Sequence, residues 1–324
     1  MKYFPKKLTM TWIRNSYKEG SLTPEELAGE IVRRAEKYRD YNIWIVAPDL
    51  KRMMGYIEKL PKDMESLPLW GIPFAVKDNI DVAGSPTTAA CPDYAYDPKE
   101  DAAVVKKLIE AGAFPVGKTN LDQFATGLVG IRSPYGEVKN ALDPELISGG
   151  SSSGSAVSVA LGMAAFSLGT DTAGSGRVPA ALNCLVGYKP SLGAWSTKGV
   201  VPACASLDCV TVFANSLEDA EKVNLAARGV DEECCWSREY KEPLPKLPKK
   251  ICLAKDGVTF YGPYEDIYKA KWEQAKKRIE DMGITVEYID YTMFSKAASI
   301  LYDGPWVAER WKDLGDFVES HPGK

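Results

Sequence analysis

The stretch GGSSSGSAVSVALGMAAFSLGTDTAGSGR, residues 149–177, restricts the fold more than any other part of this chain. Two Gly/Ser clusters, Gly149–Gly154 and Gly174–Gly176, lie on either side of an apolar segment. Residues 155–163 are predicted to form a compact helix of small side chains, and residues 164–172 a buried strand. The helix and the strand between them would bring the two Gly/Ser clusters together.

Strand-like and helix-like segments alternate through the rest of the chain. Buried or alternating strands are predicted at 42–48, 73–76, 113–120, 185–191, 250–256 and 284–291, and helices at 23–38, 49–60, 101–112, 121–130, 216–229 and 265–283, before a helical end broken at Gly304-Pro305. Such alternation is typical of α/β proteins. We expect a three-layer α/β/α fold with a mixed, mostly parallel central sheet and helices on both faces.

Residues 231–250, DEECCWSREYKEPLPKLPKK, differ in composition from the chain around them. They are polar and rich in lysine and proline, which predicts a surface excursion. We expect this excursion to interrupt one domain, residues 1–324, rather than to separate two.

The composition excludes several classes of function. A net charge of −4 provides no basic field for nucleic acid or an anionic membrane surface. No apolar run approaches the roughly 20 residues that span a bilayer, and the N-terminus lacks the pattern of a signal peptide. The seven cysteines are odd in number and contain no CxxC spacing, so we expect reduced thiols in the cytoplasm.

Histidine is the most restrictive residue type here. The chain contains one, His321, close to the C-terminus. A Ser-His-Asp triad, a Cys-His dyad or a multi-histidine metal site is therefore not expected. Any hydrolytic chemistry needs another base.

A lysine can serve as that base if burial lowers its pKa far enough to leave the amine neutral. Lys77 ends the apolar strand predicted at 73–76, where it could be either such a base or the first residue of a polar surface loop. Lys118, in PVGKTN, ends another predicted strand and competes for the same role.

Ser175 is the candidate nucleophile. It follows the predicted strand at 164–172 between Gly174 and Gly176, where its hydroxyl is uncrowded and successive backbone N–H groups can converge on an oxyanion. A flexible turn is the alternative interpretation. A serine of the first cluster could relay the proton to the lysine; Ser153 suits a helix N-cap, which leaves Ser151 and Ser152.

Over residues 20–230 the chain resembles the amidase signature family. The similar segments are GIPFAVKDNID at 71–81, VGKTNLDQFATG at 116–127, the stretch at 149–177, and PAALNCLVGYKPSLGAWSTKGVVPACASLDCVT at 179–211. The resemblance implies that Lys77 is the base, Ser151 a bridging serine in cis configuration and Ser175 the nucleophile. It excludes Lys118.

The resemblance also implies roles for the residues around Ser175. The backbone N–H groups expected to form the oxyanion hole are those of Thr172, Ala173, Gly174 and Ser175. Asp171 and Arg177 are expected to pair and to hold the turn.

The segments SLDCVTVFA and LYDGPWVAERW resemble allophanate hydrolases, including the hydrolase part of fungal urea amidolyases. In that family a tyrosine and an arginine eight residues later bind the substrate, which implies Tyr302 and Arg310 here, together with Gly127. An arginine fork and a phenol suit allophanate, a small ureido-carboxylate. The implied products are ammonia and carbon dioxide, in the second step of ATP-dependent urea degradation.

Other interpretations remain open: a general amidase, a fatty-acid amide hydrolase, the glutaminase subunit of a tRNA amidotransferase, or an idle module of a multidomain protein. Nucleotide binding is not expected, because the sequence contains neither a P-loop nor a dinucleotide-binding fingerprint. The resemblance implies no metal or cofactor, a homodimer, and fusion to or partnership with a biotin-dependent urea carboxylase. Since family domains generally exceed 324 residues, a C-terminally truncated domain is expected.

Overall fold

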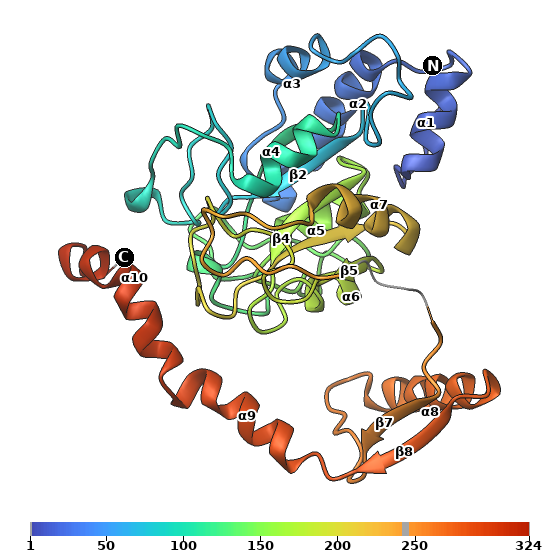
Figure 1. Cartoon of the computed structure of the whole chain (residues 1–324), viewed down its shortest axis with the longest axis vertical. Helices are drawn as coiled ribbons and strands as arrows, with labels where there is room; N and C mark the ends of the chain where they lie inside the picture. The colour runs from blue at the N-terminus through green and yellow to red at the C-terminus, as the bar shows by residue number, and fades with distance from the viewer. Residues whose placement is uncertain (1, 242–245, 324) are drawn as a thin grey trace. The chain divides into compact units, whose positions relative to one another are not determined.

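The structure of the chain is a computed structural model that describes residues 2–241 and 246–323, and at Tyr302 only the backbone. The described residues form two compact units (Figure 1). The first contains residues 2–240 and 310–323, and the second contains residues 241–309 apart from the gap. Each unit is treated by itself.

The first unit contains a six-stranded sheet in the order β1-β3-β2-β4-β6-β5. Its strands are β1 Trp44–Val46, β2 Pro73–Lys77, β3 Phe114–Thr119, β4 Phe166–Thr170, β5 Val186–Tyr188 and β6 Val210–Ala214. The expected α/β fold with a mixed sheet is confirmed. β2 is parallel to β3 and β4, whereas the other three neighbouring pairs are antiparallel; four of the six strands, β2, β3, β4 and β5, run in one direction, and β1 and β6 run in the other. Antiparallel neighbours need no crossover helix, and the loop 189–209 turns the chain back from β5 to β6.

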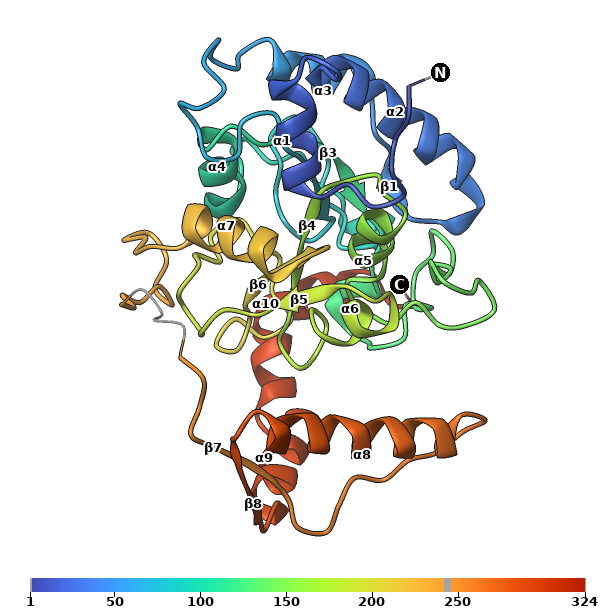
Figure 2. The same cartoon turned by 90° about the vertical axis from the view of Figure 1, so that its right-hand side faces the viewer.

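Helices cover both faces of this sheet. They are α1 Met10–Lys18, α2 Pro24–Lys37, α3 Leu50–Ile57, α4 Ala103–Glu110, α5 Ser153–Ala160, α6 Val178–Leu182 and α7 Leu217–Ala227. α5 packs on β2, β3, β4 and β6, while α4 and α7 pack on each other and on strands. Figure 2 shows the sheet between α5 and α6 on one side and α4 and α7 on the other. This is the predicted three-layer arrangement.

The small residues of α5 allow it to approach the sheet closely. Every residue of the helix is buried. A Cβ at Gly154 would lie 2.4 Å from the carbonyl oxygen of Ile43, so no larger residue fits there. The predicted N-cap role of Ser153 was wrong: Ser152 is the N-cap residue, and its hydroxyl bonds to the backbone of Thr170 rather than to the helix.

The helix predicted at 121–130 was also wrong. The structure has only a short 3-10 turn, Gln123–Ala125, in which Phe124 and Ala125 have φ values of 51° and 55°. The Asp122 carboxylate instead accepts hydrogen bonds from the backbone N–H groups of Gly130 and Arg132, at 3.1 and 2.8 Å. Local side-chain bonding of this kind competes with helix formation and closes a loop.

The second unit contains β7 Lys250–Ala254 and β8 Thr285–Ile289, paired in parallel, with helices α8 Glu265–Asp281 and α9 Thr292–Asp303. These elements confirm the predicted strands, helix and break at Gly304-Pro305. Helix α10, Trp306–Ser320, begins in this unit and belongs to the first from Arg310 onward. The excursion predicted at 231–250 includes residues 242–245, which lie outside the described residues. In the described part of the chain, no helix has both the length and the apolar character needed to cross a bilayer.

Candidate active site

Lys77 lies at the end of β2 and is completely buried. Its Nζ lies 2.8 Å from Ser151 Oγ and 2.8 Å from Thr170 Oγ1. Burial lowers the pKa of Lys77 to about 7, against the opposing pull of the nearby carboxylates of Asp122, Asp208 and Asp171. The amine is therefore available in its neutral form near neutral pH, as a general base requires.

Lys118, the competing lysine, has a different environment. It lies on β3, and its Nζ forms an ion pair with Asp78 at 3.1 Å and a hydrogen bond to Thr87 Oγ1 at 3.0 Å. Burial lowers the pKa of Lys118, and the charge of Asp78 opposes that shift. Lys118 is thus held by a carboxylate, whereas Lys77 contacts the hydroxyl groups of a serine and a threonine.

Ser151 is the serine of the first cluster that contacts the lysine. It is completely buried, the Gly150–Ser151 peptide is cis as the resemblance implied, and its carbonyl accepts a hydrogen bond from Asp122 N at 3.0 Å. The Ser152 hydroxyl is committed to the backbone of Thr170, and that of Ser153 points to Asn120 O at 3.5 Å. Of the three serines, Ser151 is therefore the one whose hydroxyl contacts Lys77.

Ser175 lies in a turn that Asp171 organises from inside. The buried carboxylate accepts hydrogen bonds from Gly174 N at 2.7 Å and Gly176 N at 3.1 Å. Arg177 donates from Nε at 2.8 Å and from Nη2 at 3.0 Å, which confirms the predicted pair. Burial acts to raise the pKa of Asp171, but the bonds and charge of Arg177 outweigh burial and leave that pKa below its ordinary value.

The Ser175 side chain faces the loop that replaces the predicted helix. Ser175 is only 6% exposed, and its Oγ donates to the carbonyl oxygen of Gly127 at 3.5 Å. Among the hydrogen bonds of the described residues, none joins Ser175 to Ser151. In this structure the Lys77–Ser151 hydrogen bond is therefore already formed, whereas the Ser175 hydroxyl points toward Gly127.

The oxyanion donors expected from the resemblance differ in their availability. Gly174 N–H is bonded to Asp171, whereas no hydrogen bond within the described chain uses the N–H groups of Thr172, Ala173 or Ser175. These three N–H groups are the ones able to bind a developing negative charge.

Asp208 lies next to the candidate site, although it was not among the residues predicted from the sequence. This buried carboxylate accepts hydrogen bonds from the Thr172 hydroxyl and from Ala203 N, the latter at 2.9 Å. Burial raises the pKa of Asp208 to about 6, although these bonds and the Lys77 charge oppose it. Asp208 thus anchors the first residue of the nucleophile turn, as Asp171 anchors its end.

Of the two side chains expected to bind the substrate, the structure describes that of Arg310 but not that of Tyr302. Arg310 Nη2 donates to Thr126 Oγ1, next in sequence to Gly127. Thr126 was not identified from the sequence, because the apolar spacing around it predicts a helix. The side chain of Tyr302 lies outside the described residues.

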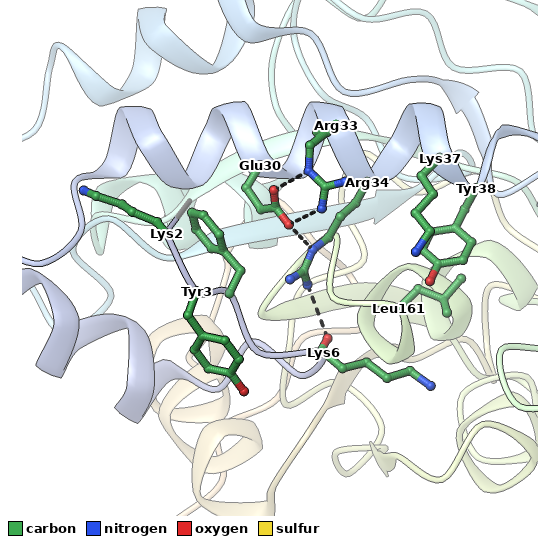
Figure 3. A pocket seen from close by; sticks show the side chains of 10 residues that line it. Lys2, Tyr3, Lys6, Glu30, Arg33, Arg34, Lys37, Tyr38 and Leu161 are labelled. Carbon is green, nitrogen blue, oxygen red and sulfur yellow. Dashed lines mark hydrogen bonds and ion pairs between the residues drawn. The ribbon is translucent and has the colours of Figure 1, made fainter.

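A cavity of about 630 Å³ lies elsewhere in the first unit (Figure 3). Its lining comes from the N-terminal segment, α2 and Leu161. The Glu30 carboxylate in it binds Arg33 and Arg34, and Arg34 also donates to the carbonyl oxygens of Lys6 and Gly162. Lys77, Ser151 and Ser175 are not among its lining residues, so the candidate active site is the β4 turn and not this cavity.

The family model described as Amidase matches residues 26–319. The chain belongs to the amidase signature family. It is 47% identical to the urea amidolyase of Saccharomyces cerevisiae over 288 residues, 87% of this chain and 16% of that protein. It is 35% identical to one subunit of the glutamyl-tRNA(Gln) amidotransferase of Methanosarcina mazei over 303 residues, 92% of this chain and 62% of that one.

Solved structures of amidases share the fold. The allophanate hydrolase of Kluyveromyces lactis matches with a TM-score of 0.87 and 42% identity, over 97% of this chain and 52% of that one. The chain therefore spans about half of this structural relative and about one sixth of the yeast urea amidolyase.

Proposed function

We propose that this amidase hydrolyses allophanate to ammonia and carbon dioxide, with Lys77, Ser151 and Ser175 as its catalytic residues. The observation that carries the proposal is the buried Lys77 amine, 2.8 Å from the Ser151 hydroxyl and with a pKa lowered to about 7. Similarity to an allophanate hydrolase and to urea amidolyases supports the choice of substrate.

The reaction begins with proton transfer. Neutral Lys77 accepts the proton of Ser151 Oγ as Ser151 accepts that of Ser175 Oγ, and Ser175 attacks the terminal amide carbonyl of allophanate. This requires the Ser175 hydroxyl to turn from the Gly127 carbonyl toward Ser151. The N–H groups of Thr172 and Ala173, with that of Ser175, stabilise the oxyanion.

The tetrahedral intermediate then collapses. The proton returns through Ser151 to the leaving nitrogen, and ammonia departs from an acyl-enzyme on Ser175. Water attacks this ester with the same relay as base and frees the enzyme. The product, a nitrogen atom carrying two carboxylates, loses carbon dioxide to give carbamate, which breaks down to ammonia and a second carbon dioxide.

Arg310 is proposed to bind the carboxylate of the substrate, together with Tyr302 and Gly127. A guanidinium binds a carboxylate in a two-pronged geometry that neither a neutral amide nor an acyl chain can provide. The contact of Arg310 with Thr126, next to Gly127, supports this role because Gly127 contacts Ser175. One short loop therefore connects the carboxylate-binding side chain with the nucleophile.

The wider setting proposed for the activity is the breakdown of urea in the cytoplasm. Urea amidolyases are the relatives that suggest it, and the chain covers one sixth of the yeast protein. We propose that a biotin-dependent urea carboxylase, fused or separate, supplies allophanate, and that the amidase acts as a homodimer.

The similarity to part of a tRNA amidotransferase makes glutamine the competing substrate. Ammonia release from allophanate, malonamate, propionamide and glutamine distinguishes the two. We expect activity with allophanate and malonamate, little with the other two, and none with Ser175→Ala. Faster release from glutamine or propionamide would contradict the proposed substrate, and full activity of Ser175→Ala would contradict the mechanism.

A further inference from the structure

The loop 122–132 is closed at its base by hydrogen bonds, and its centre has left-handed backbone angles. Asp122 closes the base by accepting the N–H groups of Gly130 and Arg132. At the centre, Phe124 and Ala125 have positive φ values, a conformation that persists in non-glycine residues only where surrounding contacts enforce it.

Those enforcing contacts come from three directions. Phe124 N donates to Ala89 O at 2.9 Å. The Phe124 ring packs edge-on against Tyr94, with centroids 5.2 Å apart, and lies 5.9 Å from the ring of Phe317 on α10. The loop and this part of α10 therefore form one packed element within the first unit.

Two consecutive residues of the loop face different functional groups. Thr126 Oγ1 accepts a hydrogen bond from Arg310, and Gly127 O accepts one from Ser175. Neighbouring Cα atoms are about 3.8 Å apart, so this dipeptide fixes the guanidinium relative to the nucleophile.

The Thr126 hydroxyl is itself oriented. It donates its hydrogen to Phe124 O at 3.1 Å, which leaves its lone pairs directed to Arg310. The bond uses one of the five N–H donors of a guanidinium, and the planar group is turned by it as a unit.

We propose that Thr126 is a positioning residue for substrate selection, whose hydroxyl holds the Arg310 guanidinium in the orientation that receives the carboxylate of the substrate. This inference rests on the proposed function, because it takes a carboxylate as the ligand of Arg310. Thr126 thereby sets the separation between carboxylate and amide carbonyl that the site accepts.

The test is calorimetric binding to the Ser175→Ala chain of two ligands of equal size. Malonamate carries one carboxylate and replaces the central NH of allophanate by CH2; malonamide is its neutral counterpart. Adding Thr126→Val, which keeps the shape and removes the hydroxyl, is expected to weaken malonamate binding about tenfold and malonamide binding less than twofold. Thr126→Ser should restore the preference, and Thr285→Val on exposed β8 should not affect it.

Equal weakening of both ligands by Thr126→Val would overturn the proposal, since a structural role lowers both affinities. Unchanged or tighter malonamate binding would overturn it as well. If the preference depends on Thr126 but the intact chain releases no ammonia from allophanate, the proposed function fails and the Thr126 assignment stands. If the Ser175→Ala chain binds neither ligand, both fail.

Discussion

Replacing Lys77 by methionine is expected to abolish hydrolysis and to stabilise the fold near neutral pH. The ordinary lysine pKa of 10.5 falls to about 7 in the folded chain, a difference of roughly 5 kcal/mol between the two protonation states. The unfolded chain holds this proton up to pH 10.5, but the folded chain only up to about 7. Unfolding therefore takes up a proton between these values, and the free energy of unfolding rises with pH in that window.

The net gain in Lys77→Met is smaller than the cost of burying the amine. The methionine deprives the hydroxyl groups of Ser151 and Thr170 of their hydrogen bonds to the lysine amine. An unsatisfied buried polar group costs about 1–3 kcal/mol of stability. We expect an increase of about 1–3 kcal/mol in the free energy of unfolding at pH 7.

Urea denaturation of both chains between pH 7.5 and 9.5 isolates the Lys77 contribution, because Lys118 and all other groups are common to both. The wild-type free energy of unfolding should gain about 2.7 kcal/mol relative to the variant over these two pH units. In parallel, wild-type kcat/KM should rise with pH up to about 7 and then level off. Parallel stability curves, or a methionine variant that retains turnover, would refute the assignment of Lys77 as a neutral buried base.

Two further substitutions test how the site is held. Asp171→Asn removes the carboxylate charge to which the N–H groups of Gly174 and Gly176 and the Arg177 side chain are bonded. We expect the rate of ammonia release to fall at least about a hundredfold and the free energy of unfolding to fall by about 2 kcal/mol. Turnover at the wild-type rate would show that the turn keeps its conformation without this charge. Gly127→Ala places a Cβ 2.5 Å from the Asp122 carboxylate and should cost about 1–3 kcal/mol in urea denaturation, whereas Gly55→Ala, in open space on helix α3, should be neutral or stabilising. An unchanged Gly127→Ala chain would show that the loop is not closely packed there.

The elements of the candidate site could be predicted because their signals are local. An apolar strand that ends in lysine predicted the strand-end position of Lys77 but left its burial open, and the resemblance to the amidase signature family then favoured the buried base. The small residues of the stretch at 149–177 predicted a helix and strand packed closely, and the resemblance of the turn after that strand to the amidase signature predicted the pair of Asp171 and Arg177. Each inference needed only one element and its end.

The contacts that complete the site could not be predicted from the sequence, because they join residues that are distant in sequence. The Asp122 carboxylate leaves no room for a Cβ at Gly127 or Gly150, and no sequence pattern shows that the backbone approaches it so closely. LDQFATGLVG has the apolar spacing of a helix, so Thr126 was assigned to the wrong structure. Strand β6 was missed although VTVFA is β-branched and apolar; that signal was present in the sequence.

The acids around Lys77 explain how its pKa can remain low. Asp122, Asp171 and Asp208 all lie near enough to oppose the lowering, yet each is bonded to backbone N–H groups of a loop or turn. The amine itself bonds to the hydroxyls of Ser151 and Thr170. A carboxylate in direct contact, such as Asp78 at Lys118, would favour the protonated amine and oppose its use as a base. The acids of the fold thus shape the loops around Ser175 while hydroxyl groups surround Lys77, and both conditions suit the proposed role of Lys77 as a base in a site without histidine.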